Sequence, residues 1–200
     1  MKDTRSAPTA SPTPAGDEQR LLALCRTGDT RAFGVLVDRY RSRAYGLALR
    51  LVQSPSDAEE VAQDAFVRAW RSLADFRGDA AFGTWLYRIV WRRALDRAAA
   101  IRIRQGRETP LDDAPAGSDA LGHRPAPMGA DPNAASWERL TEGLTDTQRA
   151  VVTLFYYEDV SVKDIARVLE IPEGTVKTHL SRARAALRAR HAAGGEPDAL

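Results

Sequence analysis

The spacing of apolar residues is the feature that most constrains the fold, because these residues recur every three or four positions through most of the chain. In residues 30–52 this spacing places one apolar stripe on one helix face, formed by Phe33, Leu36, Val37, Tyr40, Ala44, Leu47 and Leu51. Residues 57–76 and 82–100 repeat the rhythm. No segment shows the sustained alternation with a period of two that a half-buried strand requires. The sequence therefore predicts an all-α fold.

Composition divides this helical chain into two domains. Residues 1–16 are rich in Pro, Thr, Ser and Ala, which bury too little apolar surface to become ordered, so they are predicted to form a disordered tail. Residues 101–136 are dense in Pro, Gly, Asp and Ala without periodicity, which predicts a flexible linker. The sequence thus predicts two small helical domains, 17–100 and 137–192, with a second disordered tail at 193–200.

Capping residues mark where several helices begin. Ser56, in the break "SPSD", is a reasonable N-cap for the helix that follows. Thr145 with Gln148 has the spacing of a capping box, in which each side chain bonds the backbone N–H of the other residue. Ser161 with Asp164 has the same spacing before the segment "VKDIARVLE".

Charge is clustered along the chain. The formal net charge is only +2 at pH 7, so any attraction to nucleic acid depends on local groups of basic residues. One basic group consists of Arg88, Arg92, Arg93, Arg97, Arg102 and Arg104, and the segment 171–190 holds a second. An opposite, acidic group consists of Asp57, Glu59, Glu60 and Asp64.

The remaining composition points to a cytoplasmic protein without membrane insertion. The single cysteine, Cys25, rules out an internal disulfide and fits a reducing compartment. The first 20 residues lack the apolar core of a signal peptide, and no stretch approaches the roughly 18 apolar residues of a membrane span.

Residues 162–190 have the pattern of a helix-turn-helix. Its apolar skeleton consists of Ile165, Ala166, Leu169, Ile171 and Val176. In such motifs the second helix lies in the DNA major groove, and the basic helix "GTVKTHLSRAR" suits that position. Glu170 occupies the turn position where Gly is common. The alternative is that the basic helix is only a solvated face with a favourable helix dipole.

Two longer strings resemble one known family. "SDAEEVAQDAFVRAWRSLADFRGDAAFGTWLYRIV" resembles region 2, and "LTDTQRAVVTLFYYEDVSVKDIARVLEIPEGTVKTHLSRARAALR" resembles region 4, of sigma-70 family RNA polymerase sigma factors of the extracytoplasmic-function (ECF) group. The resemblance covers about residues 18 to 190, with the expected order and linker. It implies a factor that binds core polymerase, recognises the −35 and −10 promoter elements and promotes promoter melting.

The resemblance also implies roles for particular residues. Docking on the clamp helices of the largest polymerase subunit would involve Glu60, Gln63 and Asp64. The −10 element, in duplex and melted single-stranded DNA, would be held by Phe76, Arg77, Asp79, Tyr87, Arg88, Trp91 and Arg92. The −35 element would be read by Glu173, Gly174, Thr175, Lys177, Thr178, Ser181 and Arg182.

The chemistry of these residues suits those roles. Aromatic rings stack on unpaired bases and arginines bind phosphates, so we expect Tyr87 and Trp91 to be exposed, whereas packing intervals predict burial of Trp85. The acidic group beside Glu60 also has a simpler explanation, since acids favour a helix N-terminus. Two departures from the family pattern are Arg92, where many relatives carry Asn, and Ala98–Ala100, which delay the basic residues that usually follow.

Two other classes of function account for less of the sequence. A response-regulator-like helix-turn-helix regulator, acting independently of core polymerase, would account for the second domain but leave residues 55–97 unexplained. An enzyme is not expected, because His123, His179 and His191 are scattered and no phosphate-binding loop or metal-ligand spacing is present. We therefore expect no catalytic residues, metal or cofactor. The family resemblance implies an anti-sigma factor as a further partner.

Overall fold

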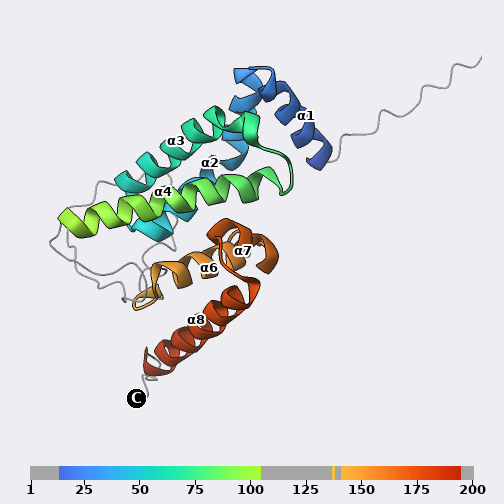
Figure 1. Cartoon of the computed structure of the whole chain (residues 1–200). Coiled ribbons are helices and arrows are strands. Elements are labelled where there is room, and N and C mark those ends of the chain that lie inside the picture. Colours follow the sequence, from blue (N-terminus) through green and yellow to red (C-terminus); the bar gives the residue numbers. More distant parts are fainter. Residues whose placement is uncertain (1–13, 105–136, 138–140, 195–200) are drawn as a thin grey trace, which may run out of the picture. The chain divides into compact units, whose positions relative to one another are not determined.

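The computed structural model describes residues 14–104, 137 and 141–194. This part of the chain contains no strand, and the predicted all-α fold class is confirmed. Its elements (Figure 1) are α1 (Pro14–Arg26), α2 (Thr30–Val52), α3 (Pro55–Arg71), the 3-10 turn η1 (Leu73–Asp75), α4 (Phe82–Arg104), α6 (Asp146–Tyr156), α7 (Val162–Leu169) and α8 (Glu173–Gly194). The predicted linker and tails lie largely outside the described residues. The predicted domain boundaries stay predictions.

The chain divides into two compact units, one up to Tyr40 and one from Arg41 onward. In the first unit, α1 and the beginning of α2 bury a small apolar set that consists of Leu22, Cys25, Ala32, Leu36 and Tyr40. The Tyr40 hydroxyl donates to the Glu18 carboxylate at 2.6 Å, and Arg39 pairs with Asp17 at 2.6 Å. Burial raises the pKa of the Cys25 thiol, which keeps it in the unreactive neutral form.

The start of α3 corrects one prediction. Its N-cap is Ser54, whose hydroxyl accepts from the Asp57 N–H at 3.4 Å, and not Ser56. The physical reason is Pro55, which lacks an N–H and has a fixed φ, so it is favoured as the first helical residue and the cap must precede it. The two other predicted caps are correct. Thr145 and Gln148 form a reciprocal capping box, and Ser161 accepts from the Asp164 N–H.

In the second unit, α3 and α4 pack side by side (Figure 1). The buried face of α3 is rich in alanine, with Ala58, Val61, Ala62, Ala65, Phe66 and Ala69. Small side chains let two helix backbones approach closely. Ion pairs join the rims of the same helices: Arg97 of α4 donates to Asp57 at 2.6 Å and pairs with Glu60 at 3.0 Å. The hydrogen bond to Asp57 raises the pKa of the Arg97 guanidinium.

Helices α6, α7 and α8 form the predicted helix-turn-helix with its preceding helix. The turn bends at Glu170, whose backbone is left-handed with φ 58° and ψ 38°. The N–H groups of Glu170 and Ile171 both donate to the Ala166 carbonyl, which ends α7. A side chain in this conformation costs on the order of 1 kcal/mol relative to Gly. The buried skeleton of Ile165, Val168, Leu169, Val176, Leu180 and Ala183 offsets that cost.

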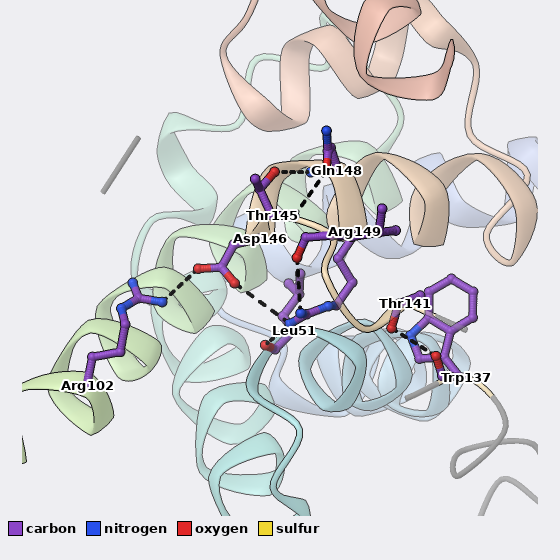
Figure 2. Close-up of polar contacts among 9 residues, drawn as sticks. Leu51, Arg102, Trp137, Thr141, Thr145, Asp146, Gln148 and Arg149 are labelled. Carbon is purple, nitrogen blue, oxygen red and sulfur yellow. Dashed lines mark hydrogen bonds and ion pairs between the residues drawn. The ribbon is translucent and has the colours of Figure 1, made fainter. Parts of the chain in front are cut away.

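A buried arginine lies where α6 meets the end of α2. Arg149 is 2% exposed, and its guanidinium donates to the carbonyls of Leu51 and Leu144 at 3.4 Å each (Figure 2). Asp146, one turn earlier, lies 3.7 Å from Arg149 and also accepts from Arg102 of α4 at 2.8 Å. Since Leu51 is in the last turn of α2, the cation satisfies a carbonyl that helix geometry leaves unpaired. Sequence reasoning missed Arg149.

We predict that Arg149→Met destabilises the protein by about 1–3 kcal/mol, because two buried carbonyls and Asp146 lose their donor. Urea denaturation followed by far-UV circular dichroism measures the free energy of unfolding. Arg188→Met is the control, because Arg188 is an exposed residue of α8, and its effect should stay within about 0.5 kcal/mol. Equal unfolding midpoints for the two variants would contradict the structural role of Arg149.

Candidate nucleic-acid interface

The first turns of α8 present one exposed polar face. Six of the seven residues expected to read the −35 element are exposed, namely Glu173, Gly174, Lys177, Thr178, Ser181 and Arg182, and Thr175 is half-buried. The opposite face is anchored by Val176, Leu180 and Ala183, each at most 4% exposed. The Thr178 hydroxyl donates to the Gly174 carbonyl at 2.9 Å. The helix thus offers two cations and several hydroxyls to a surface outside the domain, as groove binding requires.

A third cation beside this face was missed by sequence reasoning. Arg184 donates from Nε to the Tyr156 hydroxyl at 2.7 Å, and its guanidinium lies 5.8 Å from the ring centroids of Phe155 and Tyr156. Both Arg184 and Tyr156 are exposed. The signal in the sequence was the aromatic run "FYY" at residues 155–157, because an arginine is a favourable partner for an aromatic ring.

The loop between η1 and α4 encloses a cavity. Its volume is about 290 Å³, and it is lined by Asp75, Phe76, Arg77, Gly78, Asp79, Ala80, Thr84, Trp85, Arg88 and Arg167. Trp85 forms its aromatic wall, with its ring centroid 5.0 Å from Phe76 and 5.6 Å from Phe82. Gly78 adopts φ 81°, which lets the loop turn sharply around the cavity. Of the predicted −10 residues, Phe76, Arg77, Asp79 and Arg88 are therefore brought together.

Two aromatic residues predicted to be exposed are buried. Tyr87 is 3% exposed and Trp91 is 6% exposed, whereas Trp85, which was predicted to be buried, is only half-buried. The reason is that α4 packs against α7 as well as α3, so two of its faces are covered. A single helix period cannot reveal a second packing partner that comes from a distant part of the chain.

The Tyr87 hydroxyl makes a buried hydrogen bond across this contact. It donates to the Glu158 carboxylate at 2.9 Å, and Arg43 lies 3.8 Å from the same carboxylate. Burial raises the pKa of Glu158 above its usual value, while the Tyr87 hydroxyl and Arg43 lower it. Burial, together with the charge of Glu158, also raises the pKa of Tyr87. Tyr87 is therefore a neutral donor, held away from solvent in this arrangement.

The two α4 arginines of the predicted −10 set, Arg88 and Arg92, contact the helix-turn-helix. Arg92 donates to Glu170 Oε2 at 2.6 Å, and Arg88 bonds Glu170 Oε1. The hydrogen bond from Arg92, together with the charge of Arg88, lowers the pKa of Glu170, so this carboxylate stays ionised. Arg167 of α7 donates to the Asp79 carbonyl at 3.3 Å, at the edge of the cavity.

The acidic face expected to bind polymerase lies on α3. Glu60 and Gln63 are exposed and Asp64 is half-buried. Glu60 pairs with Arg97 at 3.0 Å, and Asp64 pairs with Arg68 at 2.8 Å. Gln63 donates to Glu59 at 3.3 Å. These exposed pairs are weak, so the face remains available to a basic partner.

The residues that the structure describes hold neither a metal site nor a membrane-spanning helix. No group of His, Cys, Asp and Glu in this part of the chain has the geometry to hold a metal ion. None of its helices combines the length and the apolar character that crossing a membrane requires.

Comparison with known families assigns both halves of the chain. The family described as Sigma-70 region 2 matches residues 36–105, and Sigma-70, region 4 matches residues 135–187. The RNA polymerase sigma-H factor of Pseudomonas aeruginosa is 37% identical over 180 residues, which cover 85% of this chain and 91% of that protein. The ECF RNA polymerase sigma-E factor of Escherichia coli (strain K12) is 35% identical, covering 85% of this chain and 92% of that protein.

Solved structures share this fold. CnrH, in complex with the cytosolic domain of CnrY, is 27% identical with a TM-score of 0.67, covering 88% of this chain and 98% of that one. The sigma factor RpoE from Bartonella quintana, solved with the anti-sigma factor NepR, is 21% identical with a TM-score of 0.59 over 78% of this chain and 94% of that one, and it supports the fold alone. The chain belongs to the ECF group of sigma-70 family RNA polymerase sigma factors.

Proposed function

We propose that this protein directs core RNA polymerase to promoters by binding the enzyme through α3, the −35 duplex through α8 and the melted −10 strand through the loop 76–82 and α4. The observation that carries the proposal is that one chain combines an exposed recognition-helix face with an aromatic cavity bordered by arginines. A helix-turn-helix regulator needs the first feature and has no use for the second. Members of this family initiate transcription without catalysing a reaction themselves.

Reading of the −35 element would depend on the exposed face of α8. Lys177 and Arg182 can bind guanine acceptors or phosphates, and the hydroxyls of Thr178 and Ser181 can donate or accept at base edges. Because Val176, Leu180 and Ala183 bury the opposite face of α8, the helix backbone is held rigidly and little backbone entropy is lost on binding. Phosphate contacts would supply affinity, and base contacts would supply the choice of promoter.

Capture of the melted −10 strand would depend on the cavity beside Trp85. A cavity of about 290 Å³ is suited to a single small planar group, and its aromatic wall can stack on a base. Extruding a base costs a few kcal/mol, which stacking and phosphate contacts from Arg77, Arg88 and Arg92 would offset. Tyr87 and Trp91 would take part only after α7 has moved away from α4.

Binding to core polymerase would use the acidic face of α3. Carboxylates such as Glu60 complement a basic partner surface and accelerate its encounter. Because polymerase acts inside the cell, we propose a cytoplasmic location. An anti-sigma factor is a further proposed partner, consistent with the family resemblance.

In vitro transcription tests the proposed function. Core polymerase plus the full-length protein should give transcripts with defined start sites from a genomic DNA library, because the factor supplies both promoter recognition and melting. The control is holoenzyme carrying its housekeeping sigma factor, with and without this protein. If transcription requires the holoenzyme, the protein is a helix-turn-helix regulator and the sigma-factor proposal is wrong.

For the −35 contacts, we predict that Lys177→Ala and Arg182→Ala each weaken promoter binding of the reconstituted holoenzyme about 5- to 100-fold, the range expected for one good base contact. The salt dependence of binding should also become shallower if the side chain contacts a phosphate. Fluorescence anisotropy with labelled promoter DNA measures both quantities. Lys163→Ala is the matched control, since Lys163 is an exposed lysine on α7.

Affinity for core polymerase should be unchanged in both α8 variants, because the proposed polymerase contacts lie on α3. If promoter binding and core binding fall together, the assignment of these side chains to the −35 element is wrong.

A further inference from the structure

The turn of the helix-turn-helix closes over the arginines of α4. Arg88 and Arg92 are four residues apart, so they lie on one face of α4, and α4 packs against α7. Glu170, at the C-terminus of α7, receives a bond from each: Arg88 bonds Oε1, and Arg92 bonds Oε2 at 2.6 Å. Both oxygens of one carboxylate are thus occupied by two guanidinium groups.

This arrangement imitates phosphate binding. A carboxylate and a phosphate offer the same kind of paired anionic oxygens to arginine, so they compete for the same guanidinium groups. One turn before Glu170, Arg167 donates to the Asp79 carbonyl at 3.3 Å and lines the aromatic cavity. The segment that occupies the arginines therefore also contributes a side chain to the wall of the cavity.

The backbone at Glu170 adds an independent observation. Its φ of 58° lies in the left-handed region, where Gly is favoured and a longer side chain is strained. The helix-turn-helix itself gives no reason for glutamate at this position, because its turn is closed by backbone hydrogen bonds to Ala166. The contacts that the side chain makes are those with α4.

We propose that Glu170 is an autoinhibitory latch, which occupies in cis the two arginines that hold the −10 strand and so weakens the binding of single-stranded DNA by the free protein. The latch rests on the proposed function of Arg88 and Arg92. All three side chains are well exposed, at 42% for Arg88, 57% for Arg92 and 44% for Glu170. Exposed ion pairs are weak, so the latch is one that core polymerase or a promoter strand can open.

The test measures binding of a fluorescein-labelled single-stranded 20-nucleotide DNA of random sequence to the full-length protein without polymerase, at low salt. Glu170→Gln keeps the shape of the side chain and removes its charge, so binding should tighten roughly three- to tenfold, the range expected for two exposed ion pairs. Glu170→Gly, which relieves the strained backbone as well, should tighten binding to a similar extent.

Asp159→Asn is the matched control. Asp159 is an exposed acid with φ 51°, and the structure gives it no ion pair with α4, so the substitution makes the same change of charge in the same backbone conformation. Its effect should be under about twofold, because it changes only long-range attraction. If Asp159→Asn tightens binding as much as Glu170→Gln, general charge explains the result and the latch is refuted.

A mutant cycle that combines Glu170→Gln with Arg88→Ala/Arg92→Ala tests the latch separately from the proposed DNA binding by the two arginines. In the protein that lacks both arginines, Glu170→Gln should not change the affinity for single-stranded DNA, because the carboxylate no longer has an arginine to occupy. An undiminished effect of Glu170→Gln there overturns the latch. If Arg88→Ala/Arg92→Ala alone leaves binding at the wild-type level, the proposed role of the arginines in holding the strand is wrong.

Discussion

The packing of α4 against α7 is the contact on which the arrangement of the second unit depends. Through it, Tyr87 becomes a buried donor to Glu158, and Arg88 and Arg92 become partners of Glu170. Farther along α4, Arg102 reaches Asp146, which also neighbours the buried Arg149. The polar contacts of this region include a hydrogen bond between two buried side chains, Tyr87 and Glu158, and the exposed ion pairs of Glu170. Exposed ion pairs fix the orientation of α7 on α4, but each of them contributes little free energy. The two helices can therefore separate at these pairs.

The polar contacts differ in how easily they can be broken. Arg149 is 2% exposed and donates to the carbonyls of two buried residues, so separating it from Leu51 removes hydrogen bonds where water has little access. The pairs of Glu170 lie at the surface, where water replaces each lost bond. Opening would therefore begin at the turn and the aromatic cavity, and the region around Arg149 would separate last.

Local chemistry was readable from the sequence, and distant contacts were not. The helices, the capping box at Thr145 and the left-handed turn at Glu170 follow from residue spacing and hydrogen-bonding capacity within a few positions. Ser56 was the wrong cap only because the rule for proline at the first helical position was not applied to Pro55. The burial of Tyr87 had no local signal, since its partner Glu158 is 71 residues away. The exposed face of α8 was predicted correctly, because the apolar residues of the same helix recur at helical spacing and so mark the opposite, buried face.

Because distant contacts cannot be read from the sequence, the sequence and the structure describe the basic cluster on α4 differently. From the sequence, Arg88 and Arg92 are free cations beside aromatic rings, which is the composition of a surface for single-stranded DNA. In the structure both have an anionic partner within the chain. These views agree if one surface has two occupants of the same chemistry, a carboxylate before promoter binding and phosphates after it. A surface that must bind a polyanion is also one that an internal anion can cover, and the strained backbone of Glu170 shows where this chain has put one.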